Sequence, residues 1–411
     1  MGEACAVDVE LEVLRIAHGG VSVAELGSAD DPDGPGERRR VVFVADTLPG
    51  ERVLARITDA THDRFWRAET VRVLNQSPDR QPHLWAAAGV ERPPEQRAGG
   101  AEFGHITPER QRALKEQVLR DALQRTGGLS TPEVDALGTA VRAVPGREDG
   151  SRSRTRLRLH VDQDGRVGPY ASRSRTVVPV HDLPLAVERL EALLPDRSTA
   201  RSVDLVAAAD GAFAATGRRS HGPIVEHAGG RDFGLEALGF WQVHPAAPDV
   251  LQAAVRAALG PDFDPDADNL DLYGGVGLLA AAMADAGGPA TRVSTVESDR
   301  AATDHAARNL ADLPRVRAVT ARVDQFLARP RRRPGATVVL DPPRSGAGAE
   351  VVRAIAESDP ARVVYVACDP VALARDLKTF RGLGWRPVRL EAFDLFPNTH
   401  HLEAVAALVR D

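Results

Sequence analysis

The stretch DLYGGVGLLAAAMA, Asp271 to Ala284, decides the fold of the C-terminal part of this 411-residue chain. It reads as a short β-strand, a glycine-rich turn and the start of a helix. Glycines let a ligand approach the backbone closely, and the N-terminus of the helix supplies free amides and a positive dipole end. The pattern therefore predicts a nucleotide-binding loop after the first strand of an α/β domain.

The sequence on both sides of this loop, from Phe240 onward, alternates strand and helix signals. Such alternation is typical of a parallel sheet with crossover helices. Two further strand candidates close the chain, joined by a short turn, and predict a hairpin-like last pair in a seven-stranded sheet. The strand candidates read, in order, NLDLYG, RVSTVES, RVRAVTA, ATVVLDPP, RVVYVAC, WRPVRLEAFDLF and HLEAVAALVR.

The glycine motif alone does not separate a dehydrogenase from a methyltransferase. Gly275 and Gly277 also satisfy the dinucleotide fingerprint, and Glu297 follows about 20 residues later, where an acid could hold ribose hydroxyls. Asp271 favours the methyltransferase, because a carboxylate there suits the ammonium of S-adenosylmethionine and would repel a pyrophosphate. The turn DPPRSG, Asp341 to Gly346, lies where open α/β sheets bind ligands, and together with the final hairpin it favours the same reading.

The N-terminal part of the chain has a different texture. Short β-type runs separated by turn signals, from Asp8 to Leu74, predict a small antiparallel barrel. Gln76 to Gly100 reads as a long linker, and Pro108 to Gly128 has apolar residues at helical spacing. A second β-rich region then extends to about Gly234.

Arginines at positions 152, 154, 156 and 158 alternate within this second β-rich region. On a strand they would share one face. A solvated strand face is one interpretation of this pattern, and a track for the RNA backbone is the other.

The overall composition is that of a globular protein of two or three domains, with 43% hydrophobic and 27% charged residues. A net charge of −6 argues against a protein that coats nucleic acids generally, but allows a local basic surface. Two cysteines, Cys5 and Cys368, cannot build a disulfide framework. The apolar runs are too short to cross a bilayer and no targeting signal opens the chain, so we expect a cytoplasmic protein without membrane contact.

Cys368 ends the fifth strand candidate of the C-terminal region, directly before Asp369 and Pro370, which predict a helix N-cap and first turn. A thiol at a helix N-terminus has a lowered pKa and is a better nucleophile, although Asp369 acts in the opposite direction. A small buried residue at a strand end is the alternative.

Taken together, the motifs of the chain resemble the S-adenosylmethionine-dependent RNA 5-methyluridine methyltransferases. The motifs are DLYGGVG, DPPRSG, ACDPVALARDL, FPNTHHLE and FWQVHP, and the barrel resembles the RNA-binding TRAM module of that family. The resemblance implies that Cys368 attacks carbon 6 of uridine and that Glu403 removes the proton from carbon 5. It also implies an active-site role for Asp341 and a cofactor site formed by Gln242, Asp271, Tyr273, Gly275, Gly277, Glu297, Asp324 and Asp341.

The chain also departs from the family pattern. Many relatives carry four cysteines that bind an iron–sulfur cluster, but Leu84 to Ile106 contains none, so we expect no cluster and no metal. Gly274 stands where relatives usually have cysteine, and His244 stands in place of an asparagine. Ala367 and Asp369 replace the usual serine and asparagine beside the nucleophile.

These observations predict three domains. Residues 8–75 form a TRAM-like barrel of the OB type that binds RNA, residues 76–233 a central β-rich RNA-binding domain of α+β type, and residues 234–411 a Rossmann-like class I methyltransferase domain. We expect a monomer that acts on rRNA or tRNA. An RNA-binding protein with a degenerate methyltransferase domain is the alternative. An exocyclic-amine methyltransferase is disfavoured, because Arg344 replaces the aromatic residue expected after its fourth strand.

Overall fold

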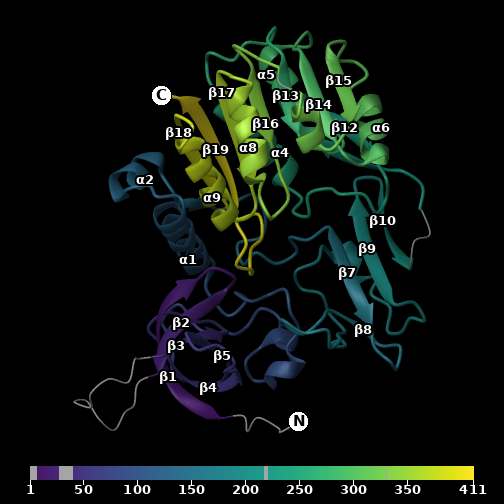
Figure 1. The fold of residues 1–411 in the computed structure, drawn as a ribbon. Coiled ribbons are helices and arrows are strands. Elements are labelled where there is room, and N and C mark those ends of the chain that lie inside the picture. The colour runs from purple at the N-terminus through teal and green to yellow at the C-terminus, as the bar shows by residue number, and fades with distance from the viewer. Residues whose placement is uncertain (1–6, 27–39, 217–220, 330) are drawn as a thin grey trace.

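The computed structural model describes residues 7–26, 40–216, 221–329 and 331–411. Cys5 lies outside these residues, so Cys368 is the cysteine that the structure describes. No helix within the described ranges is both long enough and apolar enough to cross a membrane. Helix α1 (Pro108–Asp121) lies between the barrel and the C-terminal sheet, and the central sheet lies to the right of the barrel in this view (Figure 1).

The N-terminal strands close into a barrel in the order β1-β2-β3-β5-β4, which confirms the predicted barrel. Its core follows from the alternation of side chains along a strand. In β1, for example, Leu11 and Val13 are buried while Glu10 and Glu12 are exposed. The strands are β1 (Asp8–Ala17), β2 (Val21–Leu26), β3 (Arg40–Ala45), β4 (Arg52–Asp59) and β5 (Phe65–Asn75).

The linker leads through two short 3-10 turns, η1 (Ala86–Ala88) and η2 (Pro94–Gln96), into the predicted helix. This helix is α1 (Pro108–Asp121), which continues as the π-helical turn η3 (Ala122–Thr126) and is followed by α2 (Thr131–Leu137). Both helices contribute apolar residues to the core beneath the C-terminal sheet. The short strand β6 (Val141–Arg142) pairs in parallel with the edge of that sheet, a pairing that the sequence did not predict.

The central β-rich region forms a four-stranded sheet in the order β10-β9-β7-β8 and a separate two-stranded ribbon, β11-β12. Its elements are β7 (Arg156–Val161), β8 (Val167–Gly168), α3 (Glu188–Glu191), β9 (Ser202–Ala208), β10 (Gly211–Thr216), β11 (Ile224–Ala228) and β12 (Arg231–Leu235).

The four alternating arginines do not share one face of a single strand. Arg152 and Arg154 precede β7 rather than belonging to it. Arg152 pairs with a glutamate, and Arg154 donates to a backbone carbonyl of the linker. Arg156 and Arg158 lie on β7, and each pairs with an acidic side chain. The partners are remote in the sequence, so the alternation of arginines did not indicate them. Arg152 pairs with Glu191, Arg154 with the Gly100 carbonyl, Arg156 with Glu226 and Arg158 with Asp204.

The C-terminal region forms the predicted sheet of parallel strands with an antiparallel last strand. Its order is β15-β14-β13-β16-β17-β19-β18, with β6 added at the edge. The elements are α4 (Ala247–Leu259), β13 (Asn269–Leu272), α5 (Leu278–Gly287), β14 (Val293–Glu297), α6 (Arg300–Asn309), β15 (Val316–Thr320), α7 (Val323–Leu327), β16 (Thr337–Leu340), α8 (Gly348–Glu357), β17 (Arg362–Ala367), α9 (Pro370–Arg381), β18 (Trp385–Phe393) and β19 (Glu403–Arg410).

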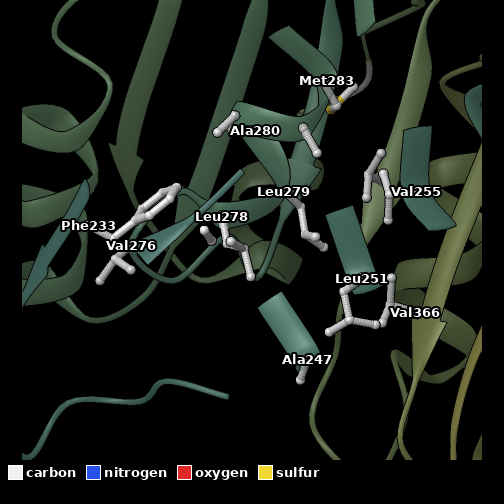
Figure 2. Close-up of a cluster of buried hydrophobic side chains, with 14 of the residues drawn as sticks. Phe233, Ala247, Leu251, Val255, Val276, Leu278, Leu279, Ala280, Met283 and Val366 are labelled. Carbon is white, nitrogen blue, oxygen red and sulfur yellow. The ribbon is translucent and has the colours of Figure 1, made fainter. Parts of the chain in front are cut away.

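Helices cover both faces of this sheet, as expected for parallel strands that are apolar on both sides. Figure 2 shows one of the two cores, in which Leu251 and Val255 of α4 lie near Leu279 and Met283 of α5. On the other face, residues of α1, α2, α7, α8 and α9 form the second core. The sheet is therefore buried, and its strand ends are the part left available for a site.

Candidate active site

The predicted site residues gather at one edge of the C-terminal sheet. Asp271, Glu297, Asp341 and Cys368 stand at or just beyond the carboxyl ends of β13, β14, β16 and β17. Strand β19 runs antiparallel to β17, so its first residue, Glu403, lies at the same edge. The strand order thus brings together residues that are up to 132 positions apart in the sequence (271 to 403).

The glycine turn after β13 has the close geometry that a nucleotide cofactor requires. Gly275 and Gly277 have φ values of +52° and +95°, which favour glycine. A Cβ at Gly277 would lie 2.6 Å from the Leu310 Cδ1 atom, so this turn has no room for a side chain there. Gly277 therefore allows close packing against Leu310, whereas a Cβ at Gly275 would meet nothing within 4 Å.

Asp271 lies beneath this turn and is fully buried. Its Oδ2 accepts a hydrogen bond from the Thr295 hydroxyl at 2.9 Å, and its Oδ1 has no hydrogen-bond partner among the described residues. Burial raises the pKa of Asp271 to about 7, partly opposed by the Thr295 bond. A buried carboxylate with a free oxygen suits a cationic ligand group, so the residues present fit the ammonium of S-adenosylmethionine.

A cavity of about 490 Å³ opens beside the glycine turn. Tyr273 and Asp324, both predicted cofactor residues, line it together with residues of the α8 N-terminus. Tyr273 has φ +61°, an unfavourable value for a non-glycine residue, and burial raises its pKa to about 12. Asp324 is held by a bidentate pair with Arg322. The cavity has the size and polar edge expected of a site for a nucleoside.

Two other predicted cofactor residues, Glu297 and Gln242, do not point into this cavity. Glu297 turns its carboxylate back onto the protein, where it accepts from the amides of Gly275 and Asp299 at 3.2 and 2.8 Å. Gln242 is half-buried in the loop between β12 and α4 and makes no hydrogen bond to the described residues. Neither residue lines the cavity, so their contact with a cofactor stays a prediction.

Cys368 follows β17, and the next residue caps helix α9 as the sequence predicted. Asp369 Oδ1 accepts from the amides of Val371 and Ala372 at 3.0 and 2.8 Å. Burial, with Glu403 and Asp341 nearby, raises the pKa of the Cys368 thiol to about 12, and Arg344 opposes that rise. The free protein therefore holds this sulfur as a thiol, contrary to the lowered pKa that the helix N-terminus suggested.

Glu403 is next to Cys368 by register, because Ala404 pairs with Ala367 across the β17–β19 ladder. Its side chain is 3% exposed, and burial together with Asp341 raises its pKa well above the usual range. Burial and the Asp271 charge also raise the pKa of Asp341 to about 7. Three enclosed carboxylates thus compete for protons at the sheet edge, and Arg344 is the cation that favours ionisation of Glu403.

The DPPRSG turn is fixed by residues that the sequence did not single out. Asp376 of α9 accepts from the Ala347 amide at 2.8 Å and from the Tyr365 hydroxyl at 2.7 Å. Gly346 packs against Asp376, and a Cβ there would approach its Oδ2 to 2.6 Å. Nothing in the spacing of these residues signals the contact, because it forms only when α9 folds back over the turn.

The loop that precedes Glu403 is anchored by helix α1, another contact that the sequence did not reveal. Lys115 is fully buried and donates to Asp394 Oδ1 at 2.6 Å and to the Phe396 carbonyl at 3.0 Å. Gln111 exchanges two hydrogen bonds with Asn398, at 2.8 and 3.0 Å. Asn398 also donates to the Asp149 carbonyl of the central region, so three parts of the chain meet at this loop.

The residues that depart from the family pattern each have defined local contacts. A Cβ at Gly274 would lie 1.9 Å from the Thr295 hydroxyl, so the glycine makes room for the threonine that binds Asp271. His244 is buried and accepts from the Ala246 amide at 3.1 Å, next to the start of α4. Asp369 acts as the helix cap and Ala367 packs in the core.

The segment that carries cluster cysteines in many relatives packs here as an apolar core. Trp85, Ala88, Ala98 and Ala101 are all buried in it. Over the ranges that the structure describes, no group of three or more His, Cys, Asp or Glu side chains is arranged to hold a metal ion. The absence of an iron–sulfur cluster stays a prediction, which an iron content near one cluster per chain in anaerobically purified protein would contradict.

Comparisons with known proteins agree with this geometry. The family model described as tRNA (uracil-5-)-methyltransferase matches residues 258–411. A protein of Streptomyces avermitilis named an uncharacterized RNA methyltransferase is 37% identical, over 99% of this chain and 98% of its own length. The 23S rRNA (uracil(1939)-C(5))-methyltransferase RlmD of Pseudomonas fluorescens is 30% identical, over 89% of each chain.

Among solved structures, the tRNA (uracil-54, C5)-methyltransferase of Pyrococcus abyssi in complex with S-adenosyl-L-homocysteine has the same fold. The TM-score is 0.69 at 19% identity, and the match covers 97% of this chain and 99% of the other. Fold and site define a class I methyltransferase that uses S-adenosylmethionine. The chain belongs to the RNA 5-methyluridine methyltransferase family and is an enzyme.

Proposed function

We propose that this enzyme methylates carbon 5 of a uridine in structured rRNA or tRNA, through a covalent bond between Cys368 and carbon 6. The observation that carries the proposal is the group formed by Cys368, Glu403, Asp341 and Arg344 at one sheet edge. Carbon 5 of uracil is a poor nucleophile. Cys368 first gives up its thiol proton to solvent. Addition of the resulting thiolate to carbon 6 gives an enolate whose carbon 5 can attack a methyl group.

Each residue of the group then has a role. When bound, S-adenosylmethionine supplies the methyl group and a positive charge. Because their pKa values are raised, Glu403 and Asp341 tend to hold protons in the free protein. Glu403 must lose its proton before it can act as a base, and a nearby positive charge favours this loss by lowering the pKa of both carboxyl groups. Arg344 favours the ionised forms of Glu403 and Cys368, and its exposed side chain can meet the negative charge of the enolate.

The reaction closes with a proton transfer. Once carbon 5 carries the methyl group, Glu403 takes the hydrogen of carbon 5 as a proton. The electron pair of that bond re-forms the ring double bond and expels the Cys368 thiolate. The thiolate then takes a proton from solvent, while Glu403 already holds the proton from carbon 5. The enzyme is thus back in its starting state with one proton released per methyl transfer, so one cysteine and one carboxylate account for the uracil chemistry.

The target base would have to leave its stack to reach Cys368. Phe240 is 76% exposed, although it directly precedes the buried Trp241. Arg156 holds this loop by donating to the Gly239 carbonyl at 2.8 Å. We infer that Phe240 provides an aromatic surface for the displaced uracil, which would explain an exposed side chain of this size.

The test is to map 5-methyluridine in total RNA from cells with and without this gene, and then in the same RNA treated with purified protein. We expect one or a few sites that appear only with wild-type protein and not with Cys368→Ser. Retention of the modification with Cys368→Ser would contradict the covalent mechanism. If cells without the gene kept all their 5-methyluridine sites, the proposed substrate would be wrong.

We also infer that the enzyme acts in the cytoplasm as a monomer.

A further inference from the structure

A second cavity, of about 400 Å³, lies outside the active site, where the barrel, the linker, the central sheet and the catalytic loop meet. We refer to it as the interdomain cavity. No residue proposed above for the methyl transfer lines it. The lining residues that carry the argument are Glu102, Arg158, His160, Tyr170, Arg173 and His400.

Two aromatic rings form one wall of the interdomain cavity. The His160 and Tyr170 rings are stacked, with centroids 3.6 Å apart and planes 8° apart. Both side chains are half-buried. The Tyr170 backbone is fixed to the linker, because its carbonyl accepts from the Gly99 amide at 2.9 Å. A Cβ at Gly99 would lie 2.8 Å from that carbonyl oxygen, so the close approach depends on glycine.

Two arginines lie at the mouth of the cavity with substantial exposure. Arg158 is 63% exposed and pairs with Asp204 at 2.7 Å, whereas Arg173 is 38% exposed and pairs with Glu69 at 3.2 Å. Burial, with Asp46 nearby, raises the pKa of Glu69 to about 7. Near neutral pH the charge of Arg173 is therefore only partly compensated, and its guanidinium is available to a phosphate.

The lining of the cavity includes the ion pair of Glu102 with His400. Glu102 Oε2 and His400 Nδ1 are buried, and neither has a hydrogen-bond partner among the described residues. They lie 3.8 Å apart, too far for a hydrogen bond. Burial disfavours ionisation of Glu102, but the neighbouring His400 outweighs it and lowers the Glu102 pKa to about 2. An ionised carboxylate in this place can accept the N–H groups on the edge of a nucleobase.

The interdomain cavity is directly connected to the catalytic loops. His400 lies three residues before Glu403, and its ring touches the barrel turn, since a Cβ at Gly20 would lie 3.0 Å from it. His18 of the same turn binds Asp369, the neighbour of Cys368, at 2.9 Å. A ligand in the cavity would therefore lie close to the segments that present the nucleophile and the base.

We propose that the interdomain cavity binds an unstacked nucleobase of the RNA substrate other than the target uridine. This inference rests on the proposed function. Aromatic stacking, an arginine for the phosphate and a buried acceptor for the base edge are together the means by which proteins hold single-stranded RNA bases. The cavity volume falls within the range of sites for molecules of this size.

Ultraviolet cross-linking of the wild-type protein to total RNA, followed by mass spectrometry of the peptides, gives a direct test. We expect a nucleotide linked to a peptide that contains His160 or Tyr170. The experiment does not require methylation, so it is independent of the proposed function. RNA cross-links on other peptides with none on the cavity peptides would overturn the proposal.

A second test uses a hairpin RNA that carries the mapped uridine, with an abasic nucleotide placed at each neighbouring position in turn. At one position the loss of the base should weaken binding to the wild type about tenfold, as expected for a stacked base. Tyr170→Ala should bind the intact hairpin about tenfold more weakly and no longer sense the abasic position. Tyr170→Phe, which keeps the ring, should behave as the wild type.

Ser172→Trp fills the cavity from an exposed position and should give the same loss as Tyr170→Ala without disturbing the core. Arg386→Gln changes an exposed residue of strand β18 that does not line the cavity and serves as the control, with no expected effect. Binding of S-adenosylmethionine checks that each variant is folded. If neither Tyr170→Ala nor Ser172→Trp alters the response to any abasic position while the wild type still methylates the hairpin, the cavity proposal is wrong and the proposed function stands.

Discussion

His18 Nε2 lies 2.9 Å from Asp369 Oδ2, so the first hairpin turn of the barrel contacts the residue that follows the proposed nucleophile. The two residues are 351 positions apart in the sequence. Asp369 also caps helix α9, and the same side chain thus links the barrel to the end of strand β17. The barrel is therefore placed to influence the cysteine.

The pair predicts a pH-dependent contribution of the barrel. The hydrogen bond to Asp369 raises the pKa of His18, although burial acts against it. A histidine with a raised folded-state pKa contributes stability below its unfolded-state pKa, and this contribution is lost as the pH rises through the folded-state value. His18→Ala should lower the free energy of unfolding by about 0.2–1 kcal/mol at pH 6 and by less at pH 8.5, since the pair is partly exposed.

Asp369→Asn keeps the helix cap, because asparagine is an equally good N-cap, but it removes the charge. It should therefore abolish most of the pH dependence of the His18 effect, as measured by urea unfolding at several pH values. A His18→Ala effect that is the same at pH 6 and pH 8.5 would show that the pair does not act through its charge.

The buried carboxylates at the sheet edge predict a second pH dependence of stability, which comes from burial of acids rather than from an ion pair. The pKa values of Asp271 and Asp341 are raised to about 7, against about 3.9 for aspartate in an unfolded chain. The folded protein then binds more protons than the unfolded chain between about pH 4 and 7, so its free energy of unfolding falls as the pH rises through this window. If the ammonium of S-adenosylmethionine binds the ionised Asp271, cofactor affinity should increase as the pH rises through 7.

Asp271→Asn keeps an oxygen for the Thr295 hydroxyl and removes the charge. It should raise the stability of the free protein at pH 8, on the order of 1–4 kcal/mol, and weaken cofactor binding about 10- to 100-fold. Calorimetric titration and thermal unfolding measure the two effects. Asp285→Asn, on the exposed side of α5, is the control. Cofactor affinity that is unchanged in Asp271→Asn would remove Asp271 from the cofactor site.

The sheet itself was predictable from the sequence because each of its strands is a short apolar run that ends in a turn. The position of the candidate cofactor site at the sheet edge was also predictable. The glycine turn and Asp271 belong to one strand and the loop that follows it, so their spacing in the sequence fixes their places. The sequence did not reveal β6 or the anchoring role of α1. Both depend on pairings across more than 200 residues, and neither Val141 nor Lys115 carries a local pattern that signals them.

The buried Lys115–Asp394 pair predicts a large effect of a single substitution. Lys115→Met leaves Asp394 buried without its partner, which costs about 3–5 kcal/mol for such a pair. The loop that leads to Glu403 should loosen as well, with a loss of kcat. Lys378 is the other lysine of the chain and is exposed on α9, so Lys378→Met is a matched control that should change neither property.

Combining Lys115→Met with Asp394→Leu removes both charges and should recover most of the lost stability, because a buried ion pair replaced by apolar groups is often neutral. Urea unfolding of the single and double variants measures this. If Lys115→Met were as stable as the wild type, the pair would not hold the loop.

The adjacent placement of Cys368 and Glu403 leads to the sharpest prediction. If the Cys368 sulfur adds to carbon 6 before Glu403 removes the proton from carbon 5, Glu403→Gln should complete the methyl transfer and then stop. The thiolate cannot be expelled until carbon 5 loses its proton, so the enzyme should remain covalently bound to methylated RNA. Glutamine has nearly the shape of glutamate, and it also removes a buried acid whose pKa is raised, so the fold should be retained.

Denaturing gel electrophoresis with labelled RNA and S-adenosylmethionine detects this adduct as a band of lower mobility. Cys368→Ser should give no band, and the double variant should behave as Cys368→Ser because the nucleophile acts first. Normal turnover by Glu403→Gln would exclude Glu403 as the base. An adduct that persists in the double variant would assign the nucleophile to another residue, and since Cys368 is the one cysteine in the part of the chain that the structure describes, that residue would not be a thiol of this site.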